Sequence, residues 1–94
     1  MELERTLDST ELGDLEPFIS AHGADPKHYL MVMGEATKLR DSQNLTFQRV
    51  RATRYDARGH DPETDEHSII DLIDIHLDFD QGVMWTGEII IGTR

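Results

Sequence analysis

Two groups of side chains in this 94-residue sequence have residue types and spacings that can support chemistry. The first group lies in the acidic segment 56–67, where imidazole and carboxylate ligands could hold zinc or another divalent ion. Its members are His60, Asp61, Glu63 and His67. The segment does not match a calcium-binding EF-hand loop, because Glu66 stands where that loop needs glycine and Leu72 where it needs glutamate. An exposed acidic loop without a metal is the alternative interpretation.

The second group consists of Asp74, His76 and Asp78, which occupy alternate positions and so share one face of an extended strand. A histidine between two carboxylates can transfer protons or form half of a metal site. The alternative is a lattice of solvated ion pairs with Arg49 and Arg51, in which each exposed pair contributes at most about 1 kcal/mol.

Other kinds of chemistry find no support in the sequence. It has no cysteine, which excludes disulfide bonds, a thiol nucleophile and thiolate metal ligands. No glycine-rich turn leads from a strand into a helix, and no serine lies in a G-x-S-x-G context, so neither a nucleotide site nor a serine nucleophile is predicted. We therefore expect no cofactor, and we favour a binding function over an enzyme.

The chain carries a formal net charge of -10, from 19 acidic and 9 basic side chains. It has no basic stripe that could neutralise a phosphate backbone, which argues against nucleic-acid binding. No run of about 18 apolar residues is present to span a membrane. The absence of cysteine makes the cytoplasm the default location. The charge indicates either general solubility or an acidic surface that docks on a basic protein.

The stretch 69–92 dominates the predicted fold, and we expect it to form a β-hairpin. Apolar and charged residues alternate from Ile73 to Phe79, and the apolar series resumes at Val83. A two-residue loop would pair carboxylates with apolar residues, whereas a three-residue loop over 80–82 lets the two apolar series meet. The predicted pairs are then Phe79 with Val83, Leu77 with Trp85, Ile75 with Gly87 and Ile73 with Ile89.

A second hairpin is predicted over 28–55. Two stretches that read as strands, 28–40 and 45–55, flank the cluster of turn-forming residues at 41–44. In two pairs, the side chains then face each other across the strands. One pair has opposite charges and the other consists of small apolar residues. These pairs are Glu35 with Arg49 and Val32 with Ala52.

A helix is predicted for residues 9–23, where apolar residues recur at helical spacing. They are Leu12, Leu15, Phe18 and Ile19. Pro17 either kinks this helix or lies in the first turn of a shorter one that begins after Asp14. Residues 1–8 are predicted to be a frayed end or a short edge strand, and residues 56–67 an exposed loop.

Together these elements predict a single domain, 1–94, of the α+β class. The N-terminal helix would pack on one face of a four-stranded antiparallel meander, made of two hairpins joined by the acidic loop. The buried face would hold Leu30, Val32, Ala36, Val50, Ala52, Ile73, Ile75, Leu77, Phe79, Val83, Trp85, Ile89 and Ile91. The outer face would hold Glu35, Arg49, Arg51, Asp74, His76, Asp78 and Glu88.

The first hairpin would also place an apolar patch on the outer face, formed by Tyr29, Met31, Met33, Phe47 and Tyr55. Glu35, Arg49 and Arg51 would surround it. A contiguous exposed patch of this kind marks an interface with another protein or with a second copy. The alternatives are that the parity of this hairpin is different or that the long loop covers the patch.

We therefore predict a small acidic, non-enzymatic protein–protein interaction module, such as an inhibitor, an immunity-type protein or an assembly subunit, that docks through its sheet face or acidic surface. Its partner would be another protein or, in a homodimer, a second copy. One alternative is a small enzyme or ligand-binding domain whose helix–sheet cavity uses His76 with Asp74 or Asp78. Another is a DNA mimic that binds a basic partner.

Overall fold

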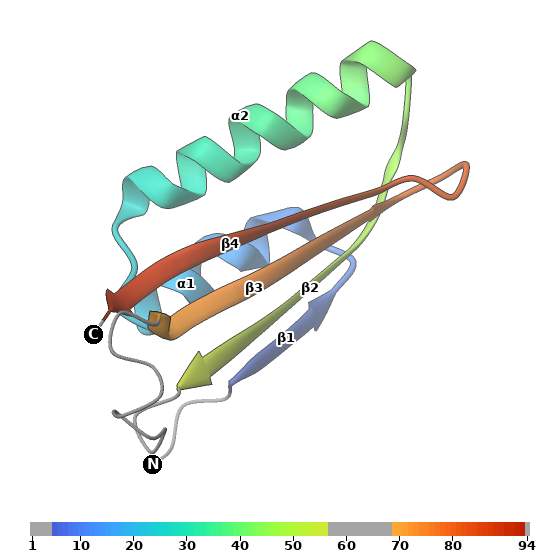
Figure 1. Ribbon diagram of the computed structural model, residues 1–94. Coiled ribbons are helices and arrows are strands. Elements are labelled where there is room, and N and C mark those ends of the chain that lie inside the picture. The colour runs from blue at the N-terminus through green and yellow to red at the C-terminus, as the bar shows by residue number, and fades with distance from the viewer. Residues whose placement is uncertain (1–4, 57–68, 94) are drawn as a thin grey trace.

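The computed structural model describes residues 5–56 and 69–93, which form a sheet layer and a helix layer (Figure 1). Both helices lie on the same side of the sheet: α1 is behind the strands in Figure 1, and α2 runs along the β4 side. The predicted α+β class is confirmed. In chain order the elements are β1 (Thr6–Ser9), the short 3-10 helix η1 (Leu12–Asp14), α1 (Leu15–Ala21), α2 (Pro26–Gln43), β2 (Phe47–Asp56), β3 (Ile69–Phe79) and β4 (Met84–Thr93).

The four strands of the described residues form one antiparallel sheet in the order β1-β2-β3-β4. Strand β1 pairs with β2, with Leu7 opposite Ala52, although both helices separate these strands in sequence. Of the two predictions for the N-terminal residues, the short edge strand therefore holds for Thr6–Ser9. The predicted sheet of four strands is therefore completed by β1, which takes the place of the strand expected over 28–40.

The β3–β4 hairpin has the predicted register. Leu77 lies opposite Trp85, and Ile75 lies opposite Gly87. The Phe79 N–H donates to the Val83 carbonyl at 2.9 Å, which closes the expected three-residue loop. Two loop residues have left-handed backbones, with φ of 61° at Gln81 and 73° at Gly82. Glycine adopts this conformation without the steric cost that a side chain adds.

The strand predicted over 28–40 is wrong, because these residues lie within helix α2. The expected pairs of Glu35 with Arg49 and Val32 with Ala52 do not form, and β2 pairs instead with β1 and β3.

Local signals at both ends explain why this segment is a helix. The Asp25 carboxylate accepts the Lys27 N–H at 2.9 Å as an N-cap, and Pro26 occupies the first helical position. At the other end, Asn44 adopts a left-handed φ of 55° and its N–H reaches the Arg40 carbonyl. Residues at helical spacing then pack on the core, namely Tyr29, Val32, Ala36 and Leu39.

The predicted helix over 9–23 is divided into η1 and α1. Pro17 lies in the first turn of α1, after Asp14 at the N-cap, which was the second of the two predicted arrangements. The Ser9 hydroxyl donates to the Asp14 carboxylate at 2.6 Å. Leu15 and Ile19 of α1 are fully buried, so this helix supplies the apolar cover that the sheet needs.

The core lies between the helices and the inner face of the sheet. Its buried apolar residues are Leu15, Ile19, Ala24, Val32, Ala36, Leu45, Val50, Ala52, Ile73, Ile75, Leu77, Phe79 and Ile89. Val83, Trp85 and Ile91 are partly buried against it, as expected. Leu30 is a correction: it is 69% exposed, because helical geometry turns it away from the face that carries Val32 and Ala36.

The Trp85 ring lies over Gly87, two residues along β4. A Cβ atom added at Gly87 would be 2.3 Å from Cη2 of this ring, far inside van der Waals contact. The glycine therefore leaves room for the tryptophan on the inner face of the sheet.

We expect Gly87→Ala to displace the Trp85 ring and lower the free energy of unfolding by about 1 to 3 kcal/mol, as overpacking does. Trp85 is the sole tryptophan, so its fluorescence reports the displacement directly. Gly13→Ala is the matched control, because no atom in the described part of the chain lies within 4 Å of a Cβ at that position. Equal stability of the Gly87→Ala and Gly13→Ala proteins would contradict the steric argument.

Loss of the N-cap should weaken α2. We expect Asp25→Ala to reduce the free energy of unfolding by about 0.5 to 2 kcal/mol in a urea titration followed by circular dichroism. Asp41→Ala serves as the control, since Asp41 is exposed and pairs with its neighbour Arg40, and it should change stability by less than about 0.5 kcal/mol. A larger loss for the control would argue against the capping role of Asp25.

Candidate functional site

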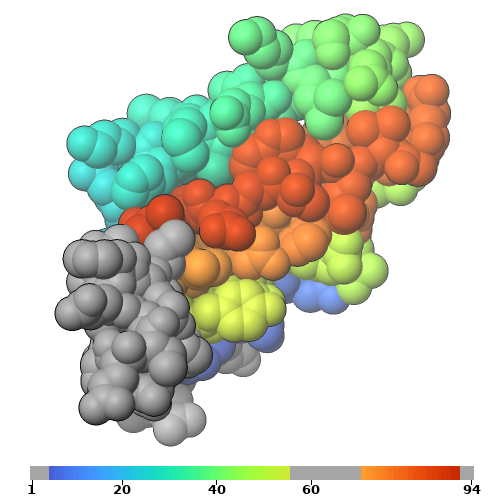
Figure 2. Space-filling model, viewed as in Figure 1, coloured from blue at the N-terminus to red at the C-terminus, as the bar shows by residue number. Residues whose placement is uncertain are grey.

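The face of the sheet that points away from the helices forms a broad surface, which we call the open face. Its outward side chains come from alternate positions of β1 to β4, the same alternation that turns Val50, Ile75 and Leu77 into the core. In Figure 2, atoms of β2, β3 and β4 are seen at the surface below α2, and no helix lies in front of them. The described part of the chain therefore leaves this face of the sheet uncovered.

The centre of the open face carries paired charges. Arg49 donates to Asp8 of β1 through Nε at 2.7 Å and through a second nitrogen, a bidentate arrangement. Arg51 donates to Asp78 at 2.9 Å. The arginines of β2 thus lie beside the aspartates of its neighbours, as expected. Glu35 of the predicted lattice is instead on α2.

Asp74 and His76 form a separate pair. His76 Nε2 lies 2.9 Å from Asp74 Oδ2, and both side chains are about one third exposed. Asp78 is engaged by Arg51, so the three predicted residues do not converge on the histidine. Among the described residues, His76 Nδ1 is buried and has no hydrogen-bond partner. The pair has the contact that proton transfer requires, but it lies on a broad sheet face where water has access.

At one end of the open face, three apolar side chains form a row across the strands. Tyr55 of β2 lies opposite Leu72 of β3, and Leu72 lies opposite Ile90 of β4. Tyr55 is 54% exposed and Ile90 47% exposed, while Leu72 is half-buried. We call these three residues the apolar row. Met84, also on this face, lies at the other end and contacts Arg51 through its sulfur.

The apolar patch predicted from the sequence does not exist as a contiguous surface. Tyr29, Met31 and Met33 belong to α2, where Tyr29 packs on the core and Met31 is exposed. Phe47 turns towards the core, and its ring meets Phe79 edge-on with centroids 6.2 Å apart. Of the five predicted residues, Tyr55 alone is on the open face, together with Arg49 and Arg51 from the predicted rim.

A polar cluster on the inner face was not predicted. Arg54 Nε donates to the Asp71 carboxylate at 2.9 Å, with a second bond from the same guanidinium. Arg54 also lies 3.3 Å from Nδ1 of His22, which is buried at the end of α1 with its ring tilted against that of Phe18. Parity along β2 could have predicted that Arg54 points inward, because it continues the series of Val50 and Ala52, but it does not identify the partners of Arg54. Mutual pairing offsets the cost of placing these charges away from water.

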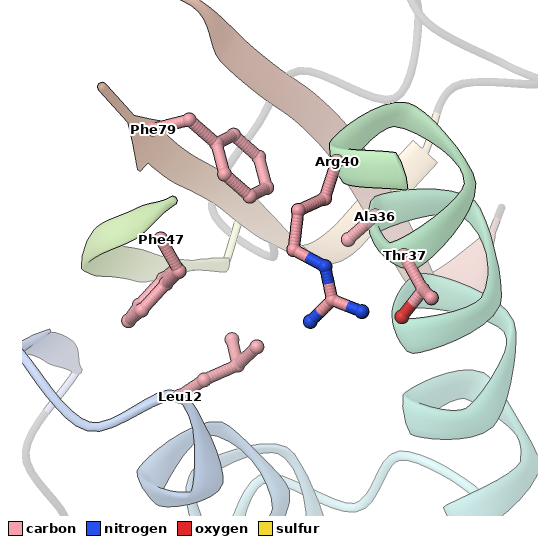
Figure 3. A pocket seen from close by; sticks show the side chains of 6 residues that line it. All are labelled: Leu12, Ala36, Thr37, Arg40, Phe47 and Phe79. Carbon is pink, nitrogen blue, oxygen red and sulfur yellow. The ribbon is translucent and has the colours of Figure 1, made fainter. Parts of the chain in front are cut away.

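A small cavity lies between α2 and the sheet (Figure 3). Its volume of about 10 Å³ is enough for one water molecule. Figure 3 shows the Arg40 side chain reaching from α2 into this space, between Phe79 and Leu12. The other lining residues are Leu12, Ala36 and Thr37. This cavity does not contain His76, Asp74 or Asp78, so it is not the pocket that the enzyme or ligand-binding alternative expects.

The predicted metal ligands His60, Asp61, Glu63 and His67 lie outside the described residues. Within the ranges 5–56 and 69–93, no group of three or more histidine, aspartate or glutamate side chains is placed to hold a metal ion.

Comparison with known proteins identified no matching family model, curated protein or solved structure. The described helices include none with the length and apolar character that a membrane crossing requires. A functional interpretation therefore depends on the side chains of residues 5–56 and 69–93 themselves.

The Asp8–Arg49 pair gives a pH-dependent prediction. The pKa of Asp8 lies below its ordinary value of 3.8, mainly because Arg49 donates hydrogen bonds to the carboxylate; desolvation opposes this effect in part, and the charges of Arg49 and Arg51 add to it. A depressed folded-state pKa means that the stabilisation from this pair is present above pH 3.8 and is lost as the pH falls through the folded-state pKa.

We expect Arg49→Gln to return the pKa of Asp8 towards its ordinary value, measured from the carboxyl chemical shift in an NMR titration. Asp25 is a control within the same spectrum, because it caps α2 on the other side of the sheet. An unchanged Asp8 titration in the Arg49→Gln protein would show that the pair is not formed in solution.

Proposed function

We propose that this protein is a small, non-enzymatic protein–protein interaction module that docks on a protein partner through its open face. An inhibitor, an immunity-type protein or an assembly subunit would each act in this way. The observation that carries the proposal is the apolar row of Tyr55, Leu72 and Ile90, which lies exposed beside a lattice of paired charges.

The apolar row supplies the kind of surface from which binding energy comes. Large apolar and aromatic side chains at the centre of an interface contribute most of its affinity, and tyrosine is enriched among such residues. Tyr55 and Ile90 are each about half exposed in the isolated chain, so a partner could remove a substantial apolar area from water at both positions. Because the three residues are cross-strand neighbours, the sheet holds them in a fixed arrangement.

The charged centre of the open face would supply orientation. Arg49 and Arg51 are held by Asp8 and Asp78 and so present their charges in defined positions. Fixed charges at an interface select partners and raise association rates more than they raise affinity. With a net charge of -10 on the whole chain, a neutral or basic partner surface is favoured over an acidic one. We place this activity in the cytoplasm, because the chain has no cysteine.

Polar substitutions in the apolar row should weaken binding of the partner. We expect the double variant Tyr55→Thr/Ile90→Thr to recover at least about tenfold less of the partner that co-purifies with the tagged wild-type protein from its source cells. Threonine keeps a strand-forming side chain at both positions, and both are solvent-exposed, so the thermal midpoint should change little.

Leu30→Gln is the matched control, because Leu30 is more exposed than either residue but lies on α2. Its partner recovery should equal that of the wild type. Equal recovery by the double variant, or a wild-type protein that binds no partner, would refute the docking role of the open face.

A further inference from the structure

Helix α2 has a second side-chain stripe that none of the described residues covers. One side of the helix packs on the core through Val32 and Ala36. On the opposite side Leu30 is 69% exposed and Met31 47% exposed. A shallow groove follows this side, lined by Leu30, Met31, Gly34, Glu35, Thr37 and Lys38. Figure 1 shows α2 at the margin of the molecule, where its outward side faces away from the sheet.

Among the described residues, no contact or backbone conformation accounts for the glycine at position 34. It lies in the middle of α2, where glycine costs about 0.5 to 1 kcal/mol relative to alanine. No atom of the described residues would lie within 4 Å of a Cβ atom at this position, and the backbone has no positive φ, so neither crowding nor conformation requires glycine there. A glycine on an exposed helix face does permit another backbone to approach closely.

The residues around Gly34 are spaced as in a helix–helix seam. Positions separated alternately by four and three residues form one narrow line along a helix. In α2 this line contains Lys27, Met31, Gly34, Lys38 and Asp41. It includes both lysines of the chain, in a protein with a net charge of -10. Segment 26–43 has three basic and two acidic side chains, so α2 is a surface where two copies of this chain would not repel each other strongly.

An antiparallel helix pair centred on Gly34 gives charge complementarity. Lys27 and Asp41 are each seven residues from Gly34, in opposite directions, so Lys27 would face the partner's Asp41 at both ends. A parallel pair would instead place lysine against lysine. In the isolated chain, Lys27 lies 3.9 Å from Asp25 and Asp41 lies 3.1 Å from Arg40. Exposed pairs of this kind are weak, so both side chains remain available to a partner.

We propose that the outward side of α2 is a self-association surface on which a second copy of this chain docks antiparallel, with a two-fold axis at Gly34. Leu30 and Met31 would then pack against the partner's Thr37 and Lys38, and the glycines would let the helices approach closely. This inference goes beyond the proposed function, because α2 and the open face lie on different sides of the sheet. Each dimer would present two open faces, and each face would bind its partner as it does in a single copy.

Light scattering after size-exclusion chromatography of the full chain tests the proposal. At concentrations in the high micromolar range, the wild type should have about twice the monomer mass of 10.8 kDa. Lys27→Glu should raise the dimer dissociation constant at least about tenfold, because it places a carboxylate against the partner's Asp41. Asp41→Lys should have the same effect, and the double reversal Lys27→Glu/Asp41→Lys should restore the wild-type constant to within about threefold.

The two single reversals control for each other. Lys27→Glu makes the chain more acidic and Asp41→Lys makes it less acidic, so general charge repulsion cannot weaken both dimers. Each change also suits the helix dipole, since it puts an anion near the start of α2 or a cation near its end. Loss of helix structure is therefore not expected, and circular dichroism verifies this for every variant.

Gly34 supplies an independent test. Gly34→Ala should raise the thermal midpoint measured in dilute, monomeric samples, whereas Gly34→Leu should prevent dimerisation by keeping the two helices apart. A wild type that is monomeric at all concentrations, or a dimer insensitive to the charge reversals and to Gly34→Leu, would overturn the proposal. Partner binding that depends on Tyr55 and Ile90 would be unaffected by that result, so the two proposals fail separately.

Discussion

The structure depends on the strict alternation of side chains along β3. Ile73, Ile75 and Leu77 are completely buried on one side of this strand, while Asp74, His76 and Asp78 lie on the other. A shift of one residue against either neighbour would exchange the two sets, burying carboxylates and exposing isoleucines. The position of β3 in the interior of the sheet extends this constraint to β2 and β4. The separation of a core face from an open face follows from it.

The same alternation explains which parts of the fold could be predicted from the sequence. The β3–β4 hairpin has an unbroken period of two and a loop whose length is selected by that period, so its register could be predicted pair by pair. In α2, the run from Tyr29 to Met33 is apolar throughout and fits either a strand or a helix. The decisive signals are at the two ends of this segment. Asp25-Pro26 indicates the start of a helix more specifically than it indicates a connector, and Asn44 indicates the end of a helix more specifically than it indicates a turn.

Those features of the candidate site that depend on a single strand could be predicted from the sequence. The outward charges of β2 and β3 follow from parity alone. The apolar row requires in addition the register between β2 and β3, which are joined through residues 57–68, and no local pattern specifies that register. The cluster of Arg54, Asp71 and His22 needed tertiary knowledge as well, because its members come from two strands and the end of a helix.

The placement of β1 has a consequence for how the sheet opens. Strand β1 reaches β2 only after the chain has passed through both helices, whereas a tight hairpin loop at residues 80–82 connects β3 to β4. The entropy lost on closing a loop grows with its length, and the four residues of β1 have few interactions to offset that loss. Sub-global opening events should therefore begin at this margin, with β1 detaching while the hairpin stays intact. Such an event would expose the backbone edge of β2 and release Arg49 from Asp8.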